Sequence, residues 1–273
     1  MAAKRKAKAA AKKAAKRAVK KVAARKPVAR KAAARRAAPA KKAVAKRAPA
    51  RKVAAKKPAA KKPPARKPAG KKIVGKIQIF GPVKSRARRT YWAVQELGLP
   101  HERVELDMAA GAHKRPDYLA INPNAKVPAM KHGDLTLFES MAINLYLAKL
   151  KGGPLAPQGP KEEARTLQWT LWGVAEVEPL LMTIGYNRMF LSEAERKEDR
   201  AQDAERKLPG PLGVLDKVLG EKPWLVGGRF TIADLNLASI VSFAKLLKLD
   251  LSRWPHVADW LDRCIARPGA KVG

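Results

Sequence analysis

An acid and a hydroxyl stand side by side at Glu139 and Ser140, where the pattern FESMAINLYLAKL predicts that a helix begins. A carboxylate can accept hydrogen bonds from an ammonium group. A hydroxyl and the free amides of a helix N-terminus can receive a carboxylate. Upstream, Pro128 stands among strand-like apolar residues in KVPAM. Taken singly, Pro128 also fits an edge strand and Ser140 an ordinary helix cap. The question is what brings the three residues together.

The elements around these residues form a compact alternating pattern. KIQIF, residues 76–80, alternates like a short strand, and residues 85–98 have helical spacing that ends at Gly98 and Pro100. Further elements follow in the order strand, short helix, strand, strand and helix. These are a strand over 101–108, a polar connection with a short helical piece over 114–124, two strands within 126–139 that flank the turn at His132-Gly133-Asp134, and a helix from Ser140.

The second half of the chain has a helical sequence pattern in place of alternating strands and helices. Residues 152–160, GGPLAPQGP, have the composition of a linker. Beyond them apolar residues recur at helical spacing, and Leu167, Leu171 and Val174 define one face of a long helix that Pro179 kinks or ends. We therefore predict a βαβαββα domain at 73–151, a linker at 152–160 and an all-α domain at 161–273.

The net charge of +36 is concentrated at one end of the 273-residue chain. Residues 1–72 hold 30 of the 59 Lys and Arg and no Asp or Glu, whereas the other 201 residues carry 29 basic and 23 acidic side chains. The segment 1–72 contains no aromatic residue, Leu or Ile. It cannot bury enough apolar surface to offset the entropy of ordering, so we predict a disordered basic tail.

The composition of this tail resembles that of linker-histone tails and of lysine- and alanine-rich histone-like proteins of bacteria. Its charge favours sequence-independent binding to nucleic acid through backbone phosphates, and its lack of aromatics disfavours base stacking. The alternatives are a solvated tail without a dedicated partner and attraction to acidic lipids. No apolar run approaches the length of a membrane span, so a cytoplasmic protein, with association with the nucleoid or chromatin as a further possibility, is expected.

Three motifs give a resemblance to a known family. They are NPNAKVP at 122–128, LFESMAI at 137–143 and RFTIADL at 229–235, and their order resembles that in soluble glutathione S-transferases. Ala125 stands where the family has glycine in the first motif. The resemblance covers about 76–268. It implies a thioredoxin-like first domain, an all-α second domain, glutathione as co-substrate, no further cofactor and, by analogy, a homodimer.

The resemblance also implies roles for the opening residues. Pro128 would be preceded by a cis peptide bond, and the N–H and C=O of Val127 would pair with the cysteinyl backbone of glutathione like an added strand. Glu139 and Ser140 would hold the γ-glutamyl end. Lys126 would meet the glycyl carboxylate, with Arg86, Arg88 or His113 as further contacts.

The group that activates the thiol is less well marked. A hydrogen bond donated to the thiolate, or a helix N-terminus, lowers a thiol pKa that is about 8.5 in a free cysteine. The family's tyrosine has no counterpart at Ile79-Phe80-Gly81, and the hydroxyl available before the first helix is that of Ser85. Ser85 is also a routine helix cap, and Lys84 or backbone amides are alternatives.

A second, electrophilic small-molecule substrate would lie between the first-helix region and the long helix. Its candidate wall residues, each also a plausible core residue, are Trp169, Trp172, Glu176 and Tyr186. Thr231 and Asp234 form a capping box, which we interpret as structural. The single cysteine, Cys264, excludes a disulfide framework within the chain, and the four histidines form no metal-binding pair.

The sequence thus predicts a glutathione transferase whose tail binds nucleic acid without sequence specificity. One alternative is a non-catalytic binding or assembly module of the same fold anchored to nucleic acid. The other is a nucleoid-compacting protein in which the tail is the functional part and the folded part has no role in compaction.

Overall fold

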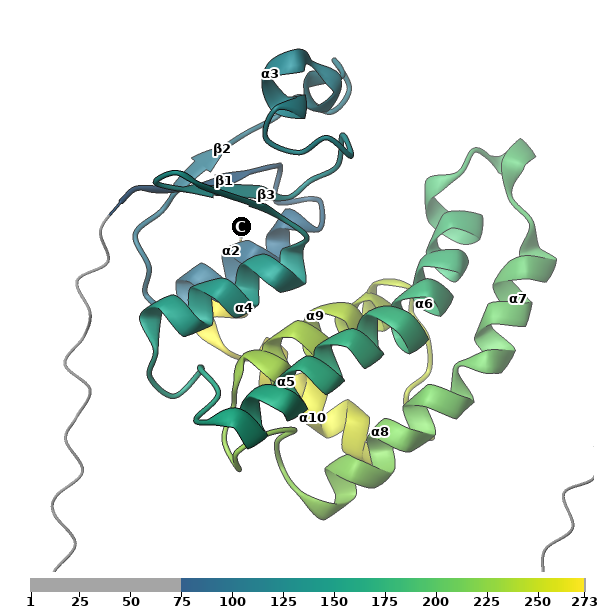
Figure 1. The fold of residues 1–273 in the computed structure, drawn as a ribbon. Coiled ribbons are helices and arrows are strands. Elements are labelled where there is room, and N and C mark those ends of the chain that lie inside the picture. The colour runs from purple at the N-terminus through teal and green to yellow at the C-terminus, as the bar shows by residue number, and fades with distance from the viewer. Residues whose placement is uncertain (1–74, 273) are drawn as a thin grey trace, which may run out of the picture. The chain divides into compact units, whose positions relative to one another are not determined.

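The computed structural model describes residues 75–272 (Figure 1). The predicted tail, residues 1–72, lies outside them. A four-stranded sheet has the order β2-β1-β3-β4, in which β1 and β2 are parallel and the other two pairs are antiparallel. The elements of this first half are β1 (Ile77–Phe80), α2 (Ala87–Glu96), β2 (Glu102–Val104), η1 (Ala112–Lys114), α3 (Pro116–Leu119), β3 (Ala129–His132), β4 (Leu135–Phe138) and α4 (Ser140–Lys151). The predicted βαβαββα order is confirmed.

The two faces of the sheet have separate partners because side chains alternate along a strand. Ile77 and Ile79 belong to the main core with α2 and α4, which lie together on one side of the sheet in Figure 1. Phe80 belongs to a small cluster with Tyr118 of the α3 region on the other side. β2 is shorter than predicted, because its three residues pair with the last three residues of β1, after which β1 ends at Phe80.

The second half of the described chain is helical. Its elements are α5 (Pro160–Trp172), the π-helical turn η2 (Gly173–Val177), α6 (Glu178–Gly185), the π-helical turn η3 (Tyr186–Phe190), η4 (Glu193–Glu195), α7 (Glu198–Lys207), α8 (Pro209–Glu221), α9 (Ile232–Leu246), α10 (Pro255–Ile265) and η5 (Pro268–Ala270). The predicted all-α character is confirmed. One buried core runs from Ile77 to Trp260 through both halves, so the division at 152–160 stays a prediction.

The long helix buries a different face from the one that its leucines indicate. Leu167, Leu171 and Val174 are 49 %, 65 % and 40 % exposed, whereas Trp169, Gly173 and Val177 are buried. Pro179 lies in the first turn of α6, directly after the π-helical turn, so it does not end the helical run. The change in register occurs before it, in the π-helical turn.

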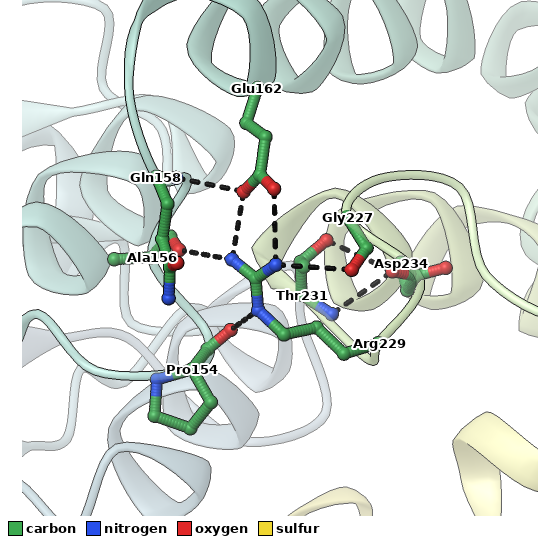
Figure 2. Close-up of polar contacts among 8 residues, drawn as sticks. All are labelled: Pro154, Ala156, Gln158, Glu162, Gly227, Arg229, Thr231 and Asp234. Carbon is green, nitrogen blue, oxygen red and sulfur yellow. Dashed lines mark hydrogen bonds and ion pairs between the residues drawn. The ribbon is translucent and has the colours of Figure 1, made fainter. Parts of the chain in front are cut away.

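Arg229 fastens the linker to the turn before α9 (Figure 2). Its guanidinium donates to both oxygens of Glu162 at 3.1 and 2.8 Å, and to the carbonyls of Pro154, Ala156 and Gly227. These bonds use all five N–H groups of the side chain. Lysine offers three donors at a single point, so it cannot make the same set of bonds.

In the described part of the chain, no helix is long and apolar enough to cross a membrane.

Candidate functional site

The loop between β1 and α2, residues 81–86, is held in place by hydrogen bonds to Gly81. The Tyr91 hydroxyl donates to the carbonyl of Gly81 at 2.8 Å, and burial raises the pKa of Tyr91 to about 12, so this donor keeps its proton. The N–H of Gly81 donates to Val104 at 3.0 Å. Gly81 has φ 129°, and a β-carbon there would lie 2.8 Å from Cβ of Val127. Glycine therefore lets this loop lie directly against Val127.

Ser85 lies in this loop, two residues before α2 begins. Its hydroxyl donates to the carbonyl of Pro82 at 2.6 Å and accepts from the N–H of Ala87 at 3.1 Å. A hydroxyl has one proton, and in this arrangement Pro82 receives it. Donation to a thiolate would require Ser85 to exchange this bond.

The segment before β3 presents the main chain of Val127. The Val127-Pro128 peptide bond is cis, as the resemblance implies. The carbonyl of Lys126 accepts two hydrogen bonds, from Tyr118 Oη and Asn122 Nδ2, both at 2.6 Å. Among the described residues, no hydrogen bond uses the N–H or C=O of Val127. This half-buried residue therefore has both main-chain groups free for a partner, and the neighbouring Lys126 is exposed.

Ala125 holds a conformation that suits glycine. Its φ is 53°, in the left-handed region, where a β-carbon costs about 1 kcal/mol. We expect Ala125→Gly to leave stability unchanged or raise it by up to ~1 kcal/mol, because relief of this strain outweighs the added freedom of the unfolded chain. Chemical denaturation measures the change. A measurable loss of stability would contradict this expectation.

Glu139 and Ser140 occupy the start of α4, as predicted. Glu139 is exposed and has φ 69°, and Ser140 is 4 % exposed and begins the helix. The first bond of the helix runs from the N–H of Ile143 to the carbonyl of Glu139, so the preceding amides have no partner within the helix. An exposed carboxylate thus adjoins a hydroxyl and free amides.

A carboxylate from the helical half reaches the start of α2. Glu178 Oε1 accepts from Arg86 Nε at 2.7 Å, and its two oxygens accept from both terminal nitrogens of Arg89 at 3.2 and 3.1 Å. Burial disfavours the charged form of Glu178, but the two arginines outweigh burial and hold its pKa below the usual range. The interaction of Glu178 with the two arginines therefore stabilises the fold at pH values above the unfolded-state pKa of about 4.3. This stabilisation is lost as the pH falls through the lower pKa of the folded state.

The structure brings most of the predicted glutathione-site residues into one region. Gly81 places the loop of Ser85 against Val127, and the pairing of Ala129 with Phe138 places the residues before β3 and the start of α4 at the same end of the sheet. Sequence reasoning missed Tyr91, Arg89 and Glu178. Nothing in the sequence indicates that Glu178, on a distant helix, would pair with α2.

The four candidate wall residues are placed differently. Trp169 is 7 % exposed and packs edge-on against the half-buried Trp172, so it offers little surface to a second substrate. Glu176 and Tyr186 are exposed. No group of three metal-ligating side chains occurs within residues 75–272.

Comparisons with known proteins agree on one family. The pattern for "Glutathione S-transferase, N-terminal domain" matches residues 76–149, and that for the C-terminal domain matches 177–268. The disulfide-bond oxidoreductase YfcG of Escherichia coli is 34 % identical, covering 69 % of this chain and 89 % of its own. Glutathione S-transferase F7 of Arabidopsis thaliana is 30 % identical, with 71 % and 97 % covered. A theta class glutathione S-transferase from Xanthomonas axonopodis with glutathione bound has a TM-score of 0.67 at 31 % identity, covering 72 % and 95 %.

Proposed function

The chain belongs to the glutathione S-transferase family, and from this premise we propose that it binds glutathione and transfers the glutathione thiolate to an electrophilic small molecule. The observation that carries the proposal is that the pairing of Ala129 with Phe138 places Val127 and the start of α4 at the same end of the sheet. Val127 has free main-chain groups, and Glu139 and Ser140 offer a carboxylate beside a hydroxyl. These groups match an α-amino acid end joined to an extended peptide.

In the proposed complex, Val127 N–H and C=O pair with the cysteinyl unit. Glu139 accepts from the γ-glutamyl ammonium, and Ser140 with the first amides of α4 receives the neighbouring carboxylate. Lys126 meets the glycyl carboxylate. The thiol then lies towards the loop 81–86, where Ser85, Lys84 or backbone amides at the start of α2 stabilise the thiolate.

In the transfer step, the thiolate forms a carbon–sulfur bond to the electrophile, and the displaced group leaves with its electron pair. A second substrate would lie against Trp172, Glu176 and Tyr186. The test is calorimetry with glutathione on the full chain, followed by turnover with a chlorodinitrobenzene, in which chloride leaves. Absence of glutathione binding at millimolar concentration would overturn the proposal. Binding without turnover of any electrophile would favour the non-catalytic module.

A second candidate function is reduction of a disulfide by bound glutathione, which the relationship to the E. coli oxidoreductase favours. One glutathione thiolate attacks the disulfide and releases one thiolate. A second glutathione then resolves the mixed disulfide to oxidised glutathione and the other thiolate. Cys264 is fully buried, and burial raises the pKa of its thiol, so both thiols come from glutathione. Bis(hydroxyethyl) disulfide is the probe, and Cys264→Ala is expected to retain the activity.

We also propose that residues 1–72 bind nucleic acid without sequence specificity, supported by their 30 Lys and Arg and absence of acids. With about ten phosphate contacts, log K should fall against log salt with a slope of roughly −9. DNA affinity that survives removal of 1–72 would overturn this assignment. Retained glutathione affinity is the control that the shortened chain is folded.

A homodimer is a further proposal, supported by the exposed stripe of Leu167, Leu171 and Val174. We expect Leu171→Glu to halve the mass measured by sedimentation, because a charge opposes burial of that stripe in an interface. Leu246→Glu, at a leucine on α9 that is 57 % exposed against 65 % for Leu171, is the control. An unchanged mass for Leu171→Glu, or a monomeric wild type, would contradict this interface.

A further inference from the structure

Helix α2 is tied to the helical half by an ion pair at each end. At its start, Glu178 pairs with Arg86 and Arg89. At its end, Glu96 accepts from Arg267 Nε at 3.0 Å and from a terminal nitrogen at 2.8 Å. From the rise per residue of a helix, Arg86 and Arg89 lie about 10–15 Å from Glu96 along the axis. Only the first ion pair adjoins the loop that carries Ser85.

We propose that Glu178 is a positioning residue for glutathione, which sets the loop 81–86 and the first turn of α2 against Val127 and the start of α4. This inference rests on the function proposed above. Glu178 would not touch the ligand. It would act through Arg86, which is next to Ser85, and through Arg89, one turn further along the helix.

Contacts connect Glu178 to both walls of the proposed site. The side chain of Arg89 is 11 % exposed and is held by Glu178, while its carbonyl accepts from Asn144 Nδ2 of α4 at 3.3 Å. Asn144 also donates to Asn236 Oδ1 of α9 at 2.9 Å. Arg89 therefore links the α6 carboxylate to the helix whose first turn carries Ser140.

The second connection runs through Arg86 to the loop 81–86. Arg86 lies between Ser85 and Ala87 in the chain, and a β-carbon on Gly81 would contact both Ala87 and Val127.

The π-helical turn before Glu178 explains why this carboxylate faces α2. The π-helical turn Gly173–Val177 adds one residue to a turn of the helix. The residues of α6 that follow are therefore rotated about the helix axis. Gly173 packs so closely on α9 that a β-carbon would lie 2.7 Å from Leu237 Cδ1. The turn is thus fixed against the core, and Glu178, 8 % exposed, is the first residue after it. Because the π-helical turn is fixed against α9, the Glu178 carboxylate is well suited to hold the loop 81–86 in one position.

Glu178→Gln in the full chain tests this role, with Glu96→Gln as the matched control. Both substitutions keep the side-chain shape and remove the charge from an ion pair that joins α2 to the helical half. We expect both to lower the melting temperature. The glutathione Kd measured by calorimetry on folded protein should rise about tenfold in Glu178→Gln, equivalent to ~1.4 kcal/mol, and stay within about twofold in Glu96→Gln.

Arg86→Gln separates positioning from stability. It leaves the buried Arg89–Glu178 pair intact, so we expect little loss of melting temperature but a severalfold rise in Kd. Equal Kd values for wild type, Glu178→Gln and Glu96→Gln would overturn the inference and assign Glu178 to stability alone. A rise in Arg86→Gln without one in Glu178→Gln would also overturn it, since Arg86 would then act directly on the ligand. Failure of wild type to bind glutathione would instead reject the proposed function.

Discussion

Replacement of Asp234 with alanine is expected to lower the free energy of unfolding by about 4 kcal/mol or more. Its fully buried carboxylate accepts four hydrogen bonds. They come from the N–H of Leu225, the indole of Trp260, and the N–H and hydroxyl of Thr231, at 2.9 to 3.1 Å. Alanine would leave these buried donors without an acceptor, and each such donor costs ~1–3 kcal/mol. The free energy of unfolding of a typical domain is only about 5–15 kcal/mol.

Denaturant unfolding of the full chain, followed by tryptophan fluorescence, measures this loss. Asp250→Ala is the control, because Asp250 also accepts two hydrogen bonds from a nearby residue, Ser252, but is exposed to water. It should shift the denaturation midpoint only slightly. Similar midpoints for the two variants would show that burial of the Asp234 carboxylate contributes little.

Replacement of Glu139 with glutamine is expected to raise the glutathione Kd about 100-fold, equivalent to ~2.7 kcal/mol. In the proposed complex the Glu139 carboxylate accepts from the γ-glutamyl ammonium, and a hydrogen bond between charged groups is about twice as strong as a neutral one. Glutamine keeps the size of the side chain but removes the charge and presents an N–H₂ donor. The backbone at φ 69° is no less accessible to glutamine, so the fold should be retained.

Calorimetry on the full chain gives the two Kd values, and the melting temperature checks that the variant is folded. Glu163→Gln is the matched control, since Glu163 also lies in the first turn of a helix and, among residues 75–272, its ion pair is with Lys149 at the surface. An unchanged Kd for Glu139→Gln would remove Glu139 from the site. A glutathione analogue that lacks the amino group should bind wild type and Glu139→Gln almost equally.

The first half of the fold could be predicted because its signals are local. Alternation in KIQIF, the turn at Gly133 and the helix start at Ser140 depend on neighbouring residues, and β1, the β3–β4 turn and α4 occur where they indicate. The cis bond before Pro128 followed from family resemblance. Ser85 was correctly located before the first helix, and its role in catalysis stays a prediction.

The second half shows where local signals fail. Periodicity identifies the helix of Leu167 and Leu171, but it cannot say whether an apolar face packs inside the subunit or lies at its surface. The buried face instead contains Thr166 and Thr170, each no more than 2 % exposed, and Thr170 accepts from Asn236. The pairing of Glu178 with Arg86 and Arg89 spans about ninety residues, and nothing near either partner signals it.

The attachment of α2 at Glu96 has a consequence for synthesis of the protein. Residues Arg267 to Ala270 follow every other helix and strand in the described chain. Arg267 pairs with Glu96 at the end of α2, and Arg88 near its start donates to the carbonyl of Ala270. When residues up to Lys151 have left the ribosome, this segment is still about 120 residues away. At about 5–20 residues per second, the nascent sheet with its two helices waits on the order of ten seconds for its last piece. During that interval the side of α2 that packs on the helical half is exposed, and chaperones can bind it.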